Sequence, residues 1–318
     1  RLGWLDAPYH AKNFIDEINN FRDEIIREGY THAVLLGMGG SSLAAEVFGL
    51  SFRGRVDGLS LIILDSTDPR QVISTENGIP LDKTLFIVAS KSGGTSEVQA
   101  LMKYFYQKVH AVLGNDVGRN FIAITDPDTV LEKQAKELGF RKIFYADPTV
   151  GGRFSALTKF GLIPAALIGV DLDSFIQNSI EFSKLCRPGV PAARNPGLVL
   201  GVILAEAAIM GKDKLTIFAE EPFRSFGSWL EQLIAESTGK EGKGIVPVDC
   251  EPILDSNNYS QDRLIVYLRN DGIFENIIQN FSEMNLPNIT FDWKDPYDLG
   301  AEFFRWELAT AVACSLLG

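Results

Sequence analysis

Five short apolar runs recur through the first half of the chain, and their pattern limits the possible folds more than any other feature. They span residues 33–36, 59–64, 85–89, 121–125 and 142–145. Each run is rich in Val, Ile, Leu or Phe and lacks polar alternation, which is typical of strands buried on both faces of a parallel sheet. Because helical patterns separate the runs, we predict a doubly wound α/β domain.

The second half of the chain repeats this alternation. Its strand-like runs span residues 215–218, 244–248, 264–268 and 289–291. Between the halves, residues 187–191 contain two prolines and a glycine, which interrupt regular structure. We therefore predict two α/β domains, residues 1–187 with bridging helices and residues 188–318 with a C-terminal helix. Each is expected to hold a mainly parallel sheet flanked by helices.

The most informative polar segment is residues 90–97, with the sequence SKSGGTSE. A helical pattern follows, in which these apolar residues recur at three- and four-residue intervals: Val98, Leu101, Met102, Phe105, Val109 and Val112. Four hydroxyls, Lys91 and two glycines thus crowd a helix N-terminus, where hydroxyls and backbone N–H groups can bind a phosphate. The alternative is a helix capped by Thr95 or Ser92, but a cap needs one hydroxyl and not four.

A glycine-rich turn, GMGGSS at residues 37–42, follows the first apolar run and precedes another helical pattern. Glycine allows tight turning and close approach of the backbone to a ligand, and the following helix N-terminus offers N–H groups to an anion. The turn departs from the dinucleotide pattern GxGxxG because position 42 is Ser. Asp65 at the end of the second run keeps a nucleotide interpretation open, and a plain strand–helix turn is a further alternative.

Two charged residues stand where chemistry could use them. Arg153 follows two glycines, which would let the backbone aim its guanidinium inward, although a surface pair with Asp147 is an alternative. Glu236 lies four residues after Gln232, in the last turn of a predicted helix with Gly239 as its C′ residue. A carboxylate base is plausible there, and a surface pair of Glu236 with Lys240 is the alternative.

Composition argues against several function classes. The formal net charge is −11, so we expect no broad attraction to nucleic acid or to an anionic membrane. Cys186, Cys250 and Cys314 are scattered, which fits a reducing compartment and predicts a cytoplasmic protein. No apolar stretch of about 20 residues predicts a transmembrane helix. No His, Cys and Asp cluster has the spacing of a metal site.

Taken in order, these segments resemble the glucose-6-phosphate isomerase family, which is built from two sugar-isomerase (SIS) domains. GMGGSS resembles its first glycine turn, VASKSGGTSEV (88–98) its phosphate loop, and EQLIAESTGKEGKG (231–244) its helix with the catalytic glutamate. GGRFSALTKFG (151–161) is close to the GGR[FY]S signature, although Pro148 replaces a small polar or acidic residue. The segments LLGMGGSSLA, AESTGKEGKGIVPV and YDLGAEFFRWELATAVA look most like the isomerase half of transaldolase–isomerase fusions, so we expect part of a longer, fused chain.

The resemblance implies a role for each matching residue. It assigns substrate binding to Gly40, Ser41, Ser90, Lys91, Ser92, Thr95 and Gln232, with the Ser90, Lys91, Ser92 and Thr95 group on the phosphate. It assigns catalysis to Arg153, which would stabilise an enediolate, and to Glu236, which would move a proton between C1 and C2. The implied reaction interconverts glucose 6-phosphate and fructose 6-phosphate, needs no metal or cofactor, and takes place in a homodimer.

Two departures from the family pattern bear on this expectation. The family opens the sugar ring with a histidine placed after the catalytic glutamate, whereas no histidine follows His110 here. The family also has a later segment with a glutamine and a lysine near the substrate, and this sequence ends before it. Three alternatives stay open: a dual glucose/mannose 6-phosphate isomerase, a non-catalytic sugar-phosphate-binding regulatory module, and a nucleotide-binding protein.

Overall fold

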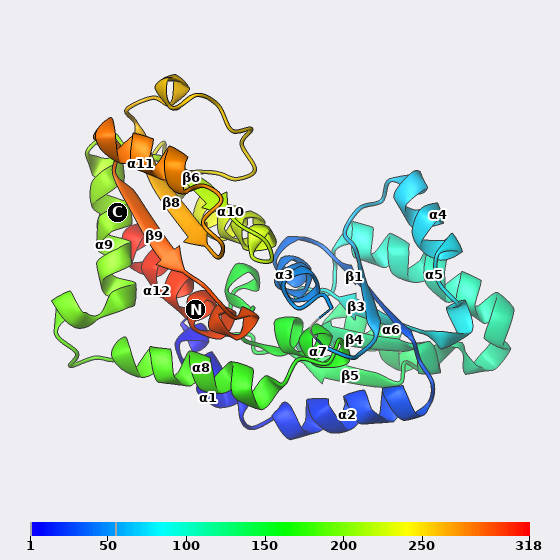
Figure 1. The fold of residues 1–318 in the computed structure, drawn as a ribbon. Helices are drawn as coiled ribbons and strands as arrows, with labels where there is room; N and C mark the ends of the chain where they lie inside the picture. Colours follow the sequence, from blue (N-terminus) through cyan, green and yellow to red (C-terminus); the bar gives the residue numbers. More distant parts are fainter. Residues whose placement is uncertain (1, 55) are drawn as a thin grey trace. The chain divides into compact units, whose positions relative to one another are not determined.

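The computed structural model describes residues 2–54 and 56–318, which fold into two compact units (Figure 1). The first unit ends at Asp173 and the second is Ser174–Gly318. This division falls one helix earlier than the sequence suggests, because α8 (Leu172–Leu185) packs within the second unit. There Ser179 Oγ donates to Gly300 O at 2.5 Å.

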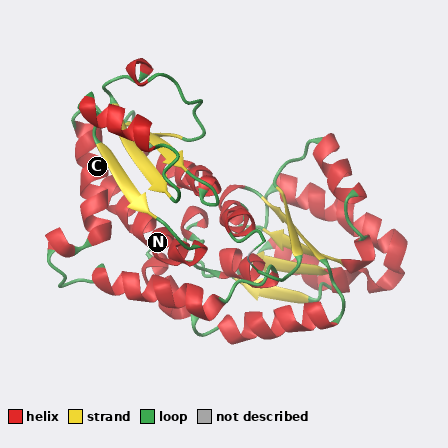
Figure 2. Ribbon diagram, viewed as in Figure 1, coloured by secondary structure: helices red, strands yellow, loops and turns green. Residues whose placement is uncertain are grey.

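Each unit contains one parallel sheet with helices around it, which confirms the predicted fold class (Figure 2). The first sheet has the order β2-β1-β3-β4-β5 and the second the order β7-β6-β8-β9. The strands of the first unit are β1 (His32–Gly37), β2 (Ser60–Leu64), β3 (Thr84–Ala89), β4 (Phe121–Thr125) and β5 (Lys142–Tyr145). Those of the second are β6 (Lys214–Ala219), β7 (Val246–Val248), β8 (Arg263–Arg269) and β9 (Asn288–Asp292).

The remaining helices connect these strands. In the first unit they are α1 (Ala7–Ala11), α2 (Ile15–Arg27), α3 (Leu43–Ser51), α4 (Pro69–Asn77), α5 (Ser96–Leu113), α6 (Val130–Glu137) and α7 (Lys159–Leu167). In the second unit they are α9 (Pro196–Ile209), α10 (Arg224–Thr238), α11 (Glu275–Glu283) and α12 (Leu299–Leu317). The short 3-10 helices are η1 (Gly3–Asp6), η2 (Gly39–Ser41), η3 (Leu81–Lys83), η4 (Gly114–Asn120), η5 (Gly152–Phe154), η6 (Ala192–Arg194), η7 (Ser256–Asn258) and η8 (Pro296–Asp298).

The core of the first unit lies on both faces of its sheet. Helices α4, α5 and α6 pack on one face, where the Phe86 ring lies 5.0 Å from that of Phe105 and 4.9 Å from that of Phe121. Helix α7 contacts β1 and packs with α2 and α3. The predicted apolar stripe of α5 is buried except for Val112 in the last turn, which is 55% exposed.

The second unit is built around two tightly packed helices. A Cβ on Gly201 of α9 would lie 2.6 Å from Ala309 O and from Val312 Cβ of α12, so glycine permits this close approach. On the sheet, α11 packs over Phe218 and Tyr267 through Phe281.

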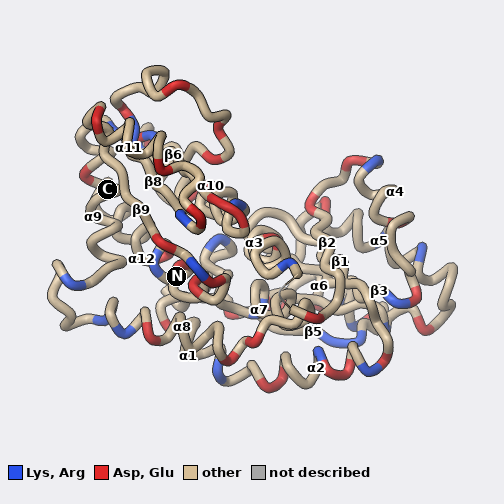
Figure 3. Tube along the Cα trace, in the orientation of Figure 1, with Lys and Arg blue, Asp and Glu red and all other residues tan. Residues whose placement is uncertain are grey.

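Acidic and basic residues are interspersed along the traces of both units (Figure 3). Within the described residues, no helix has both the length and the apolarity that a membrane span requires.

Candidate functional site

Both sheets share one connectivity, and this connectivity places a topological switch point in each. In the first unit β1 lies between β2 and β3, so successive connections run to opposite sides of β1. The carboxyl ends of β1 and β3 then form a topological switch point, where open α/β sheets bind their ligands. Gly37 and Ala89 are paired at those ends, so residues 38–42 and 90–95 leave the sheet side by side.

Residues 90–95 form a tight turn at this edge. Ser90 is buried, and its Oγ lies 3.1 Å from Thr95 Oγ1. Gly93 has a φ of +69°, which L-residues rarely adopt, and its N–H donates to Ser90 O at 3.2 Å. Gln99 Nε2 donates to Gly93 O at 3.0 Å. These contacts hold the hydroxyls of Ser90 and Thr95 together at the N-terminus of α5.

The first turn of α5 lacks a side-chain cap among the residues that the structure describes. Thr95 occupies the N-cap position, but its hydroxyl makes no capping hydrogen bond. Ser92 Oγ accepts the N–H of Gly94 at 3.4 Å and does not cap the helix either. The first N–H groups of a helix have no intrahelical acceptor, so without a cap they are left for water or for an anion.

The Lys91 ammonium is engaged within the unit. Its Nζ lies 2.7 and 2.8 Å from the two carboxylate oxygens of Asp126, and it donates to Asp147 O at 2.9 Å. The side chains of Lys91 and Asp126 are 15% and 20% exposed, so this pair is largely shielded from solvent. Lys91 thereby ties the turn after β3 to the segments that follow β4 and β5.

The glycine turn after β1 packs directly on the turn that precedes Arg153. A Cβ on Gly40 would lie 2.6 Å from the carbonyl carbon and oxygen of Gly152 and 2.8 Å from the backbone nitrogen of Arg153. Ser155 Oγ donates to Gly40 O at 3.2 Å and to Gly152 O at 2.5 Å. Only glycine fits at position 40 without moving backbone, and Ser41 is carried on the same turn.

Arg153 lies in η5, next to the Gly40 contact. Its guanidinium carbon is 5.7 Å from the centre of the Phe154 ring. The carboxylate of Asp147 accepts hydrogen bonds from the Thr149 N–H at 2.8 Å and from the Thr149 hydroxyl at 2.6 Å. These hydrogen bonds lower the pKa of Asp147.

In the second unit, α10 carries both predicted residues of the glutamate segment. Gln232 Nε2 donates to Glu236 Oε1 at 3.2 Å, so the two side chains lie together on one face, and Glu236 is exposed. The helix ends at Thr238, and Gly239 has a φ of −75° and not the left-handed backbone of a C′ glycine. A Cβ there would lie 2.7 Å from Ala235 O, so close approach favours glycine at position 239.

The structure thus collects most of the predicted residues around one switch point. The turns at the ends of β1 and β3 and the η5 turn of the first unit carry Gly40, Ser41, Ser90, Lys91, Ser92, Thr95 and Arg153. Gln232 and Glu236 belong to the second unit. No group of His, Cys, Asp or Glu side chains suited to a metal ion occurs among the described residues.

Sequence reasoning missed several supporting residues. Asp126 binds the ammonium of Lys91, Ser155 joins the two glycine turns, and Gln99 fixes Gly93. Asp126 and Ser155 act on partners 35 and 115 residues away, so no local pattern marks them.

Curated proteins similar in sequence to this chain include several named glucose-6-phosphate isomerase. A glucose-6-phosphate isomerase of Prochlorococcus marinus is 31% identical over 245 residues, which cover 72% of this chain and 45% of that protein. One of Methanocaldococcus jannaschii is 31% identical over 261 residues, which cover 77% of this chain and 63% of that protein. This chain therefore spans about half to two thirds of the length of these curated relatives.

The fold has a close counterpart among solved structures. A hypothetical protein from Thermus thermophilus superposes with a TM-score of 0.87 at 24% identity, covering 99% of this chain and 85% of that one. The family model described as "Phosphoglucose isomerase" matches residues 8–249, which include both turns of the first switch point, η5 and all of α10. The chain belongs to the phosphoglucose isomerase family.

Proposed function

We propose that this chain interconverts glucose 6-phosphate and fructose 6-phosphate. The observation that carries the proposal is the uncapped N-terminus of α5, beside the paired hydroxyls of Ser90 and Thr95. Such a site offers N–H and O–H donors to a phosphate dianion without requiring a free cation. Membership of the phosphoglucose isomerase family supports a hexose phosphate as the ligand.

In this proposal the first unit holds the phosphate. The hydroxyls of Ser90, Ser92 and Thr95 donate to its oxygens, while Lys91 keeps the turn in place through Asp126. The sugar extends toward the turn of Gly40 and Ser41. Because the phosphate is remote from C1 and C2, its binding energy serves to orient the reacting carbons.

The proposed chemistry needs one base and one cation. Glu236 takes the proton from C2 of the open-chain aldose and returns it to C1, while the hydroxyl proton of O2 passes to O1. The carbonyl thereby moves from C1 to C2 without an external oxidant or reductant. Gln232, which donates to the Glu236 carboxylate, orients that base and positions the substrate. Arg153 stabilises the negative charge that develops on the enediolate oxygen.

The assembly is also part of the proposal. The outer side of α9 exposes Val199, Val202 and Ile203 by 37–39% and Met210, which follows the helix, by 74%, which supports a homodimer that covers an apolar face. The segment likeness to transaldolase–isomerase fusions supports a partner domain on the same polypeptide. Light scattering on the isolated chain tests the first point, and the mass of the polypeptide that its own cells produce tests the second.

The decisive test is formation of fructose 6-phosphate from glucose 6-phosphate by the wild type and by Glu236→Gln. Loss of a general base reduces the rate by about 10²–10⁴-fold, and we expect a loss of this size in kcat. Circular dichroism should show that the exposed amide leaves the fold intact. Unchanged activity in Glu236→Gln would refute the base assignment. A wild type that binds the sugar phosphate without turnover would instead support a regulatory module.

A second variant pair tests the phosphate site separately. We expect Ser90→Ala/Thr95→Val to lower kcat/KM by about 10–100-fold, equivalent to about 1.4–2.8 kcal/mol, and to weaken competitive inhibition by inorganic phosphate by the same factor. Ser96→Ala is the matched control, because Ser96 is exposed at the first position of α5. Equal effects of the two changes would contradict the proposed phosphate position.

A further inference from the structure

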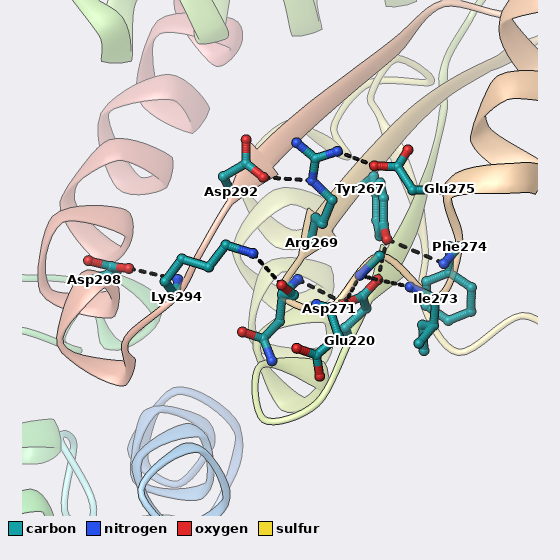
Figure 4. A network of polar contacts seen from close by, with 12 residues as sticks. Glu220, Tyr267, Arg269, Asp271, Ile273, Phe274, Glu275, Asp292, Lys294 and Asp298 are labelled. Atoms are coloured by element: carbon teal, nitrogen blue, oxygen red, sulfur yellow. Dashed lines mark hydrogen bonds and ion pairs between the residues drawn. The ribbon is translucent and has the colours of Figure 1, made fainter.

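The second switch point contains a buried carboxylate that the proposed reaction does not use. Glu220 follows β6, is 2% exposed, and lies at the carboxyl edge of the sheet (Figure 4). The loop that it meets, residues 270–273, follows β8 on the neighbouring strand. Since β6 lies between β7 and β8, this place corresponds to the switch point between β1 and β3 in the first unit.

Four consecutive backbone N–H groups converge on this carboxylate. Glu220 Oε2 accepts from Asn270 N at 2.8 Å, from Asp271 N and from Gly272 N at 3.0 Å. Glu220 Oε1 accepts from Gly272 N at 3.0 Å and from Ile273 N at 2.7 Å. Successive N–H groups that point to one centre form an anion-binding nest, the same device that holds phosphate in many proteins.

A side-chain donor completes the nest. The Tyr267 hydroxyl donates to Glu220 Oε1 and accepts the N–H of Phe274 at 3.3 Å. Burial alone would raise the pKa of Glu220, but the hydrogen bonds from Tyr267, Asp271, Asn270 and Gly272 together hold that pKa at about 2. The carboxylate is therefore ionised at neutral pH, and the nest already contains an anion.

A surface hollow of about 320 Å³ adjoins this carboxylate. Four of its lining residues are acidic, namely Glu220, Glu221, Asp249 and Glu251, whereas Arg224 is the single basic one among the described lining residues. Glu251 is paired with Arg263 at 2.7 Å, but the other acidic residues of the lining still outnumber Arg224. This excess of negative charge disfavours a second anion, even though the hollow is large enough for a small ligand.

We propose that Glu220 is an internal anion that closes the second switch point to phosphate and other tetrahedral oxyanions. Its carboxylate occupies the nest that a phosphate would otherwise fill. Removal of this side chain should convert residues 270–273 into an open oxyanion site. The inference concerns binding and not turnover, so it stands or falls independently of the isomerase proposal.

The test compares inorganic phosphate binding by the wild type, Glu220→Ala and Glu221→Ala. We expect Glu220→Ala to bind about one more phosphate per chain than the wild type in calorimetric titration. Phosphate should also slow hydrogen exchange of the amides of residues 270–273 in this variant alone. Glu221→Ala is the matched control, because it removes the same group from the next, exposed position. Chloride at equal ionic strength, together with the wild type, gives the general salt effect.

Each outcome of this test either supports or overturns the proposal. A folded Glu220→Ala that binds no additional phosphate, or that gains no protection at residues 270–273, overturns the proposal. If Glu220→Ala is unfolded in phosphate-free buffer, refolding on addition of phosphate supports it. Failure to refold, while the isosteric Glu220→Gln is folded, overturns it, because the loss of charge is then tolerated and the anion does not replace the side chain.

Discussion

The two switch points of this chain have the same strand connectivity, but they differ in the groups that lie at their carboxyl edge. In the first unit, the turn after β3 presents the hydroxyls of Ser90 and Thr95 beside an uncapped helix. In the second, the loop after β8 directs its N–H groups to Glu220. A shared topology therefore provides a place for an anion, and a few side chains decide whether that place is open or already filled.

A second correspondence makes the comparison more exact. In the first unit Lys91, after β3, pairs with Asp126, after β4. In the second unit Arg269, at the end of β8, pairs with Asp292, at the end of β9, at 2.6 Å (Figure 4). Each unit thus joins its third and fourth strands in chain order with a cation and an aspartate at the ligand-binding edge.

The substitution with the largest expected effect disrupts the packing of the turns at the first switch point. Gly40→Ala would put a Cβ 2.6 Å from the backbone of Gly152, and backbone cannot give way cheaply. We expect the free energy of unfolding of the first unit to fall by about 1–3 kcal/mol, with a loss of kcat/KM as Arg153 is displaced. Hydrogen exchange of peptides from the first unit, resolved by mass spectrometry, measures the stability change.

Gly94→Ala is the matched control for this change. Its Cβ would meet nothing within 4 Å, so we expect an effect within about 0.5 kcal/mol. Equal destabilisation by the two substitutions would show that the contact between the turns of Gly40 and Gly152 does not hold the first switch point together.

The next prediction compares the protonation of two buried carboxyl groups in the second unit. Glu307 of α12 is fully buried, and neither of its carboxylate oxygens has a hydrogen-bond partner among the described residues, unlike those of Glu220. Burial raises the pKa of Glu307 well above its usual 4.5. The folded unit then binds a proton that the unfolded chain releases, so its stability is fully present below pH 4.5 and is lost as the pH rises through the folded pKa.

Burial also raises the pKa of Glu302, on the same helix, to about 7, so it contributes a slope of its own below that pH. Glu307→Gln should remove the pH dependence above pH 7 and leave the second unit more stable than the wild type at pH 8. The wild type should lose up to about 1.4 kcal/mol per pH unit within that window. Tryptophan fluorescence during urea unfolding follows the second unit, which holds Trp229, Trp293 and Trp306 of the chain's four tryptophans. Glu221→Gln, an exposed carboxyl, should leave the slope unchanged. A slope above pH 7 that survives in Glu307→Gln would assign that slope to another group.

The smallest expected effect concerns the stability that each cation–aspartate pair at the strand ends contributes. The side chains of Lys91 and Asp126 are 15% and 20% exposed, whereas those of Arg269 and Asp292 are 31% and 55% exposed. We expect Lys91→Met to cost about 1–2 kcal/mol and Arg269→Met to cost clearly less, because solvent screens the second pair. Urea unfolding of both variants measures this, and the reverse order would contradict the burial argument.

Much of the fold can be predicted from the sequence because parallel strands that are buried on both faces give uninterrupted apolar runs. The ranges predicted for β4 and β5 match the structure, β2 and β3 differ by one residue at the start, and β1, β6, β8 and β9 are each one residue longer at both ends. The prediction for β7 was too long at its start. Gly244 has a φ of +147°, and the Ile245 N–H donates to Thr238 Oγ1 at 2.9 Å, so the chain is still turning there.

The candidate site could be located from the sequence where its residues share a local turn, and not where they depend on distant partners. Residues 90–97 were recognisable from their hydroxyls and glycines alone. Lys91 shows the limit, because its local setting suggested a phosphate ligand while Asp126 lies 35 residues away. Glu220 had no local signal at all, since Glu220, Glu221 and Pro222 look like a solvated turn until residues 270–273 are placed beside them.

The uncapped first turn of α5 has a further consequence, for dynamics. A helix whose leading N–H groups lack acceptors frays at that end, so the region around Thr95 is the weak point of a helix that is otherwise held by one buried face. A phosphate bound there would act as the missing cap and would also offset the positive end of the helix dipole. Binding of the phosphate would then order the first turn of α5. The free and the phosphate-bound protein would differ mainly in how well ordered this turn is, and little in their fold.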